Sequence, residues 1–236
     1  MEVHHHSHPG RKRFKEYFLE FVMIFLAVTL GFFAESIREH IRDDEHAKLL
    51  TKQLVKDLET DTLNLAEVIH FDTKYEKILD TLFFELQNPV ETVDTKHLQQ
   101  LIFKSYYADL FNPSTGAIAA IEKELNLKKF SMSDIPGLIT NYQSKIVTAK
   151  AGEDLILRLI EQNVEPFIYA HISPQNAYNV FSKGGLANDA SIRNLKQEDM
   201  TELSVKLQVI AALINDRIHW LMQIKSDAVK IIQYIK

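Results

Sequence analysis

The sequence predicts an all-α protein in which a single apolar helix near the amino terminus continues into an elongated helical bundle. Glycine and proline are scarce, at 7 and 6 of 236 residues, which favours long uninterrupted elements. Apolar residues recur three or four positions apart through much of the chain, as they do on one face of a helix. The alternation of apolar and polar residues that predicts strands is not sustained anywhere in the sequence.

The apolar stretch lies at residues 21–34, which carry no charged side chain. At ~1.5 Å per residue this run spans roughly 21 Å, less than a hydrocarbon core of ~30 Å. Starting the span at Tyr17, with Glu20 near the lipid headgroups, lengthens it to roughly 27 Å. We therefore predict a transmembrane anchor over residues 17–36.

Charged residues on either side of the anchor predict its orientation. Basic residues cluster before it, whereas those after it are mixed with acidic residues. They are Arg11, Lys12, Arg13 and Lys15 before the anchor, and Arg38, Arg42 and Lys48 after it. Because the more basic side of a span stays in the cytoplasm, we expect a cytoplasmic tail over residues 1–16. The domain over residues 37–236 then lies on the far side of the membrane.

Two other interpretations compete with an uncleaved anchor. A cleaved signal peptide has a basic start, an apolar core of this length and a small-x-small site, which Ala34-Glu35-Ser36 supplies. The helical pattern continues straight through that site into SIREHIRDDEH, which favours an anchor. The buried helix of a soluble protein would seldom be apolar on all faces with a basic cluster at one end.

The segment YFLEFVMIFLAVTLGFFAESIREHI resembles the opening of a set of uncharacterised single-pass membrane proteins from Bacteroidota. In these proteins a short, often His-rich tail precedes the span, and an E-x-x-R-E-H motif follows it. The likeness covers residue 14 to about residue 60, and a weaker one lies at FNPSTGAIAAIEKELNLKKF. Relatives carry a second glycine in that stretch, which this chain lacks at 122–126. The resemblance implies a bacterial inner-membrane protein with a helical periplasmic domain, and it implies no activity.

The anchor helix is predicted to continue far beyond the membrane. Neither proline nor glycine occurs between Phe32 and Asn88, and Pro89 then ends the helix. Its apolar stripe consists of Ile37, Ile41, Leu50, Leu54, Leu58, Leu65, Ile69, Leu79, Leu82 and Leu86.

Shorter helices are predicted in the middle of the chain. One covers residues 95–111 and is capped by Asp94 or Thr95. Its apolar face is Leu98, Leu101, Ile102, Tyr106 and Leu110. The turn NPSTG follows, in which Ser114 or Thr115 caps another short helix.

The segment SMSDIPG predicts the start of the next helix. Ser133 or Asp134 caps it, Pro136 lies in its first turn, and residues 139–163 follow. Two later prolines are expected to interrupt the pattern, Pro166 and Pro174. Residues 182–191, with two adjacent glycines, are expected to form a loop.

The last helix is predicted over residues 197–235. Its apolar residues recur with an average spacing of 3.5 residues, the period of a coiled coil. They are Leu207, Ile210, Ile214, Ile218, Leu221, Ile224, Ala228, Ile231 and Ile235. A narrow apolar seam on so long a helix needs a partner. We expect either the long first helix, packed antiparallel, or a second copy of the chain.

The His-rich tail is a candidate metal site. His4, His5, His6 and His8 place four imidazoles within five positions, and neutral imidazole suits zinc, nickel and copper. The alternatives are a tail that binds metal only incidentally and a tag derived from cloning.

Other polar residues each have a functional and a structural interpretation. Glu20 could take part in proton-coupled work, as intramembrane carboxylates do in ion-driven motors. Its structural interpretation is a carboxylate that reaches the lipid headgroups. Ala27 and Gly31 form a small-xxx-small pattern that lets two helices approach closely. His40 and Asp44 are i, i+4 neighbours and could bind a cation, but a solvated charged collar fits them better. In the last helix, surface ion pairs are expected of Asp216, Arg217 and His219.

The sequence shows no catalytic motif, such as a P-loop, a G-x-S-x-G elbow or an H-E-x-x-H zinc site. A net charge of −5 gives no indication of nucleic-acid binding, and no cofactor is predicted. We therefore expect a membrane-anchored interaction or scaffold protein, whose partners are the lipid bilayer and either further copies of itself or another envelope protein. The alternative is a periplasmic ligand-sensing bundle that signals through a partner, and an enzyme is the third interpretation.

Overall fold

The computed structural model describes residues 14–106, 108–123, 134–183 and 192–236. Over these residues the chain is helical and forms no strand, which confirms the all-α class; an isolated bridge joins Ile172 to Ile192. The elements are α1 (Phe14–Glu85), η1 (Val90–Thr92), α2 (Thr95–Lys104), α3 (Gly116–Lys123), α5 (Ile135–His171), α6 (Pro174–Lys183) and α7 (Gln197–Ile235).

The chain divides into two compact units, residues 1–49 and residues 50–236. The described part of the first unit is the beginning of α1, from Phe14. It contains a stretch near the amino terminus that is long and apolar enough to cross a membrane, and no residue of that stretch is buried. Just after it, Arg38 Nη2 donates to Glu35 Oε1 at 2.6 Å, a pair one helical turn apart and largely exposed.

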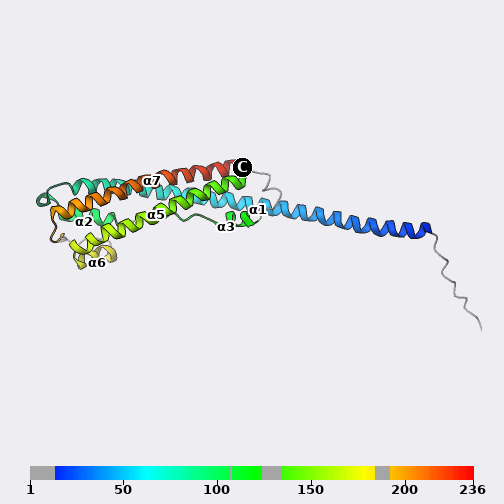
Figure 1. The fold of residues 1–236 in the computed structure, drawn as a ribbon, viewed down its shortest axis with the longest axis horizontal. Helices are drawn as coiled ribbons and strands as arrows, with labels where there is room; N and C mark the ends of the chain where they lie inside the picture. The colour runs from blue at the N-terminus through cyan, green and yellow to red at the C-terminus, as the bar shows by residue number, and fades with distance from the viewer. Residues whose placement is uncertain (1–13, 107, 124–133, 184–191) are drawn as a thin grey trace, which may run out of the picture. The chain divides into compact units, whose positions relative to one another are not determined.

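The second unit is built on three long helices, namely the end of α1, α5 and α7 (Figure 1). Polar contacts set their directions. Lys236 meets Glu59 and Arg217 meets Asp72, so α7 runs antiparallel to α1. Arg217 also meets Glu153 of α5, and Asp199 near the start of α7 lies beside His171 at the end of α5, so these two helices are antiparallel as well. It follows that α1 and α5 run in the same direction.

Each long helix presents a buried seam whose residues are three or four positions apart, the spacing of helices that pack along their length. On α1 the seam is Leu54, Leu58, Asp61, Leu65, Val68, Asp72, Tyr75, Leu79 and Leu82, and Leu86 continues it just after the helix. On α5 it is Ile135, Ile139, Tyr142, Ile146, Ala149, Glu153, Ile156 and Ile160. On α7 it is Leu207, Ile210, Ile214, Ile218, Leu221, Ile224, Ala228 and Ile231.

Helix α2 begins as predicted and ends earlier than predicted. Asp94 caps it by accepting hydrogen bonds from the backbone N–H groups of Lys96 and His97 at 3.0 and 3.1 Å. The helix ends at Lys104 and not at residue 111. The hydroxyl of Tyr75 on α1 donates to the backbone carbonyl of Ser105 at 2.5 Å. In a continuing helix this carbonyl would accept a hydrogen bond from the backbone N–H four residues later. Beyond that point Leu110, predicted to face the core, is 43% exposed.

The prediction that Pro166 interrupts its helix is wrong, because α5 continues through this residue to His171. Proline removes one backbone donor, but buried Val164 and Phe167 on either side keep the following turn packed in the core. Pro174, by contrast, does start a new helix, α6. The predicted cap Ser133 and most of the predicted loop, residues 184–191, lie outside the described residues.

Candidate functional site

Two polar layers interrupt the apolar seams of the second unit, and the first is centred on Asp61 of α1. Its Oδ2 accepts a hydrogen bond from the hydroxyl of Tyr142 on α5 at 2.7 Å, and its Oδ1 accepts from the backbone N–H of Ser114 at 2.8 Å. Both Asp61 and Tyr142 are fully buried. This single carboxylate therefore joins α1 to α5 and to the segment before α3.

The start of α3 is held by a second carboxylate of α1. Asp57, one turn before Asp61, accepts from the backbone N–H of Ala117 at 3.1 Å, and Gln53 donates to its other oxygen at 2.7 Å. The sequence predicted a cap from Ser114 or Thr115, but the carboxylate that bonds this N–H comes from another helix.

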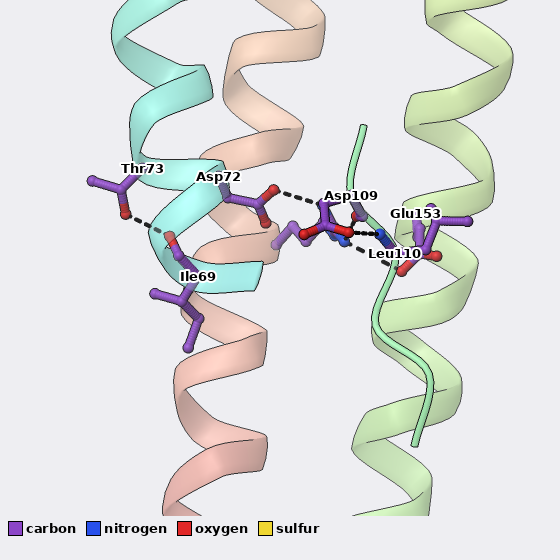
Figure 2. Close-up of polar contacts among 7 residues, drawn as sticks. Ile69, Asp72, Thr73, Asp109, Leu110 and Glu153 are labelled. Carbon is purple, nitrogen blue, oxygen red and sulfur yellow. Dashed lines mark hydrogen bonds and ion pairs between the residues drawn. The ribbon is translucent and has the colours of Figure 1, made fainter. Parts of the chain in front are cut away.

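The second layer, which we call the Arg217 cluster, consists of Arg217 on α7, Asp72 on α1, Glu153 on α5 and the backbone carbonyl of Asp109. Arg217 Nη1 donates to Asp72 at 2.7 Å, and Nη2 donates to the Asp109 carbonyl at 2.5 Å and to Glu153 at 3.4 Å. Figure 2 shows Asp72 and Glu153 directed toward each other across the segment that carries Asp109. Four parts of the chain thus meet at one guanidinium.

The burial of Arg217 contradicts the sequence prediction of a surface ion pair. Only 3% of Arg217 is exposed, and Asp72 is fully buried, whereas Asp216 and His219 do lie on the surface as predicted. The position of Arg217 could have indicated this, since it lies seven residues after Ile210 and three after Ile214, beside the apolar seam. Asp72 likewise lies on the three-and-four spacing of the α1 seam.

The Arg217 cluster is not fully satisfied by the described residues. Asp72 Oδ2 and Arg217 Nε are both buried and have no hydrogen-bond partner among them. Such groups cost free energy in an apolar interior. The cluster therefore carries an energetic cost, and we infer that it selects one alignment of the three helices.

The pKa values of both carboxyl groups in the cluster are raised. Burial raises the pKa of Asp72 from its ordinary value to about 7, against the opposing effect of the Arg217 guanidinium. Burial also raises the pKa of Glu153, again opposed by Arg217. One guanidinium compensates one carboxylate, so the second carboxyl group tends to keep its proton up to neutral pH.

The two layers share one register between α1 and α5. Tyr142 lies 81 residues after Asp61, and Glu153 lies the same number of residues after Asp72. Polar groups that must meet inside an apolar seam disfavour shifted alignments, because a shift would leave them buried without partners. The layers thus fix the parallel alignment of these two helices.

A third polar contact joins α5 to α7, toward the C-terminal end of α7. Asp227 accepts from Asn141 at 3.1 Å and from Lys145, and Lys230 reaches its other oxygen at 3.3 Å. Burial works against ionisation of Asp227, but the hydrogen bonds from Lys145 and Lys230 outweigh it and lower the pKa of this carboxyl group.

The remaining predicted site residues are not brought into one site. His4, His5, His6 and His8 lie outside the described residues. Among the described residues no group of three or more His, Cys, Asp or Glu side chains is placed to hold a metal ion, so His40 and Asp44 gain no further ligand. Glu20 and Ala27 are exposed, and the space around Gly31 is open.

Two of the surface hollows on the described residues are each lined by residues of a single helix. One lies on α7 between Gln197 and Lys206, and the other on α1 between Ala34 and Glu45. Neither lies between helices, and neither includes a residue of the Arg217 cluster.

Comparison of the chain with protein-family models, curated proteins and solved structures finds no match. The likeness to single-pass Bacteroidota proteins therefore stays a prediction.

Proposed function

We propose that the chain is a single-pass membrane protein anchored by residues 17–36, with its amino terminus in the cytoplasm of a bacterial cell. Residues 37–236 then form a periplasmic helical domain that acts as an interaction or scaffold module. Its partners are the lipid bilayer and either further copies of the chain or another protein of the envelope.

One observation supports the anchor above all others. The apolar stretch of α1 is long enough to cross a membrane, and no residue of it is buried against the rest of the chain. Phe25 and Leu26, for example, are 58% and 50% exposed. The core helix of a soluble protein would bury such residues, and lipid is the solvent that accepts them at no cost.

The anchor is tested by one substitution and a matched control. Arg at the centre of a span costs about 2.5 to 3.5 kcal/mol on the insertion scale, so Leu26→Arg should move the chain from the alkali-washed membrane fraction into the soluble fraction. Val209→Arg on α7 is the control, because Val209 is similarly exposed, at 53%. If both variants stay in the membrane to the same extent as the unchanged chain, residues 17–36 are not the anchor.

The interaction role is supported by the construction of the second unit. Its three long helices are held in one register by the Asp61 layer and the Arg217 cluster, which produces a long helical unit of defined alignment. We favour a scaffold over a sensor, because the long helices pack along continuous buried seams. Affinity purification from native membranes tests this role: co-purifying envelope proteins or further copies support it, and a strictly monomeric chain with no partner contradicts it.

A further inference from the structure

Six residues in the first unit form an apolar seam on α1, here called the membrane-edge seam. They are three or four positions apart: Met23, Ala27, Leu30, Ala34, Ile37 and Ile41. In heptad notation Ala27, Ala34 and Ile41 take position a, and Met23, Leu30 and Ile37 take position d. All six are exposed, and the four larger ones are exposed by 57% to 65%. The seam therefore has the spacing of a helix–helix contact without an intramolecular partner among the described residues.

Lipid accounts for the seam only in part. Ile37 and Ile41 follow the polar pair Glu35 and Ser36, and every residue of the segment 38–45 except Ile41 is ionisable. A segment with this many ionisable side chains does not enter the hydrocarbon region. Lipid acyl chains therefore do not cover these two isoleucines. They are 59% and 57% exposed, and they continue the spacing of the seam beyond the apolar stretch.

A second copy of the chain fits this stripe. Two copies held by the same anchor have the same orientation and the same depth in the membrane, so identical seams face each other at the same height. In a parallel pair, position g of one helix lies beside position e of the next heptad in the other. His40 of one copy then lies beside Glu45 of the second copy, and Phe33 beside Arg38. An imidazole beside a carboxylate and a ring beside a guanidinium are both favourable pairs.

The same geometry shows where the contact ends. The next two positions of the repeat are Asp44 and Lys48, each of which would meet its own copy and be repelled by like charge. From Leu54 onward α1 instead carries a seam that is buried within its own chain. The seam thus runs from Met23 to Ile41, roughly 27 Å at ~1.5 Å per residue.

We propose that the membrane-edge seam joins two copies of this chain in a parallel pair, from Met23 within the membrane to Ile41 in the first turns beyond it. This inference rests on the proposed function, because the anchor sets the common orientation and depth.

Cysteine crosslinking tests the pair directly, since the chain contains no cysteine. Single substitutions are made in the full chain in native membranes and oxidised with copper phenanthroline. Ile37→Cys and Ile41→Cys should each give a band at twice the mass of the chain. The controls are Glu39→Cys and Asp43→Cys, which lie on other faces of the same turns and should not give this band. Equal crosslinking at all four positions, no crosslinking at the two isoleucines, or a product of any other mass would overturn the second copy as the occupant.

A charge substitution within the seam provides a second test. Ile41→Glu places like charges opposite each other, so it should reduce crosslinking at Ile37→Cys, while Glu39→Gln should not. The same membranes are washed with alkali. A chain that stays in the washed membrane without a crosslink at Ile37 leaves the anchor standing and overturns the pair. A chain that leaves the membrane in the wash overturns both proposals.

Discussion

The two parts of α1 differ in what their apolar residues contact. In the first unit Leu26, Leu30 and Phe33 are 50%, 64% and 63% exposed, whereas in the second unit Leu54 and Leu58 are fully buried. One continuous helix therefore carries two kinds of apolar surface. The buried part has a narrow seam that α5 and α7 cover, and the exposed part is apolar on every side.

This difference shows that apolar content alone does not place a helix in a core. The second part alternates its seam with charged residues, so only one stripe leaves water and the rest stays solvated. The first part has no polar face over residues 21–34, and none of these residues is buried. We infer that the two parts of α1 are adapted to two solvents, the bilayer and the interior of the chain's own bundle.

The largest expected effect lies in the Arg217 cluster. Arg217→Met leaves Asp72 and Glu153 buried without a cation, and removing one partner of a buried pair costs about 3 to 5 kcal/mol. Unfolding by urea in detergent, followed by the fluorescence of Trp220, measures the loss, because this is the chain's single tryptophan and it lies in the second unit.

The matched change in the first part is Arg38→Met. Arg38 pairs with Glu35, but its side chain is 75% exposed, and exposed pairs contribute only about 0 to 1 kcal/mol. The Trp220 transition should therefore stay in place. Equal losses from both substitutions would contradict the distinction between the two parts.

A leucine truncation in each part sharpens the comparison at the level of packing. Leu58→Ala should destabilise the second unit by about 2 to 5 kcal/mol, because it opens a cavity in a closely packed core. Leu30→Ala removes the same atoms from a side chain that is 64% exposed, and it should leave the Trp220 transition unchanged. A shift of that transition by Leu30→Ala would show that the two parts unfold as one.

A smaller effect is expected from the Asp61 layer. Tyr142→Phe removes the hydroxyl that donates to Asp61 and leaves a buried carboxylate oxygen without this donor, at a cost of about 1 to 3 kcal/mol. Tyr169→Phe is the control, because Tyr169 is 73% exposed although it also donates to a carboxylate, Glu165. The urea midpoints of the two variants provide the measurement, and a control that loses as much as Tyr142→Phe would argue against the layer.

The smallest expected effect is a dependence of stability on pH. The folded-state pKa of Asp72 is raised to about 7 from an ordinary value of 3.8, so between these values the folded state binds more protons than the unfolded state. Stability therefore falls as pH rises through this window and levels off above the folded-state pKa. From about pH 6 to about pH 8 the loss should be about 1 kcal/mol.

Asp72→Asn should reduce this slope, since an amide does not titrate. Glu153, whose pKa burial also raises, supplies a remaining contribution of the same sign. Urea midpoints at several pH values provide the measurement, with Asp80→Asn on the exposed face of α1 as the control. A profile that rises with pH in the unchanged chain would contradict the proposed charge balance.

Local signals predicted most of the helices. The apolar repeat predicted α7 over residues 197–235, and the structure confirms these bounds. Asp94 was predicted as a cap because a cap depends only on residues next to it in sequence. The absence of glycine and proline predicted that α1 would be unbroken, and it ends at Glu85, shortly before Pro89.

The polar layers depend on contacts between distant segments, which a single sequence does not show. Asp57 bonds an N–H group 60 residues away, and Arg217 reaches Asp72 across 145 residues. Ser105 ends α2 through a bond to Tyr75 that no local pattern indicates. The available signal for buried polar residues was the spacing of Asp61 and Asp72, which fits the three-and-four repeat of the α1 seam. This spacing is seen only when polar residues are counted in that repeat together with the apolar ones.

The most direct test of the two-solvent account is the side of the membrane on which the carboxyl terminus lies. Alkaline phosphatase, which becomes active only outside the cytoplasm, is fused after Lys236 and, as a control, after Lys15. The account predicts activity for the fusion at Lys236 and none for the fusion at Lys15. An inactive phosphatase after Lys236 in a stably produced fusion, or recovery of that fusion in the soluble fraction, would contradict it.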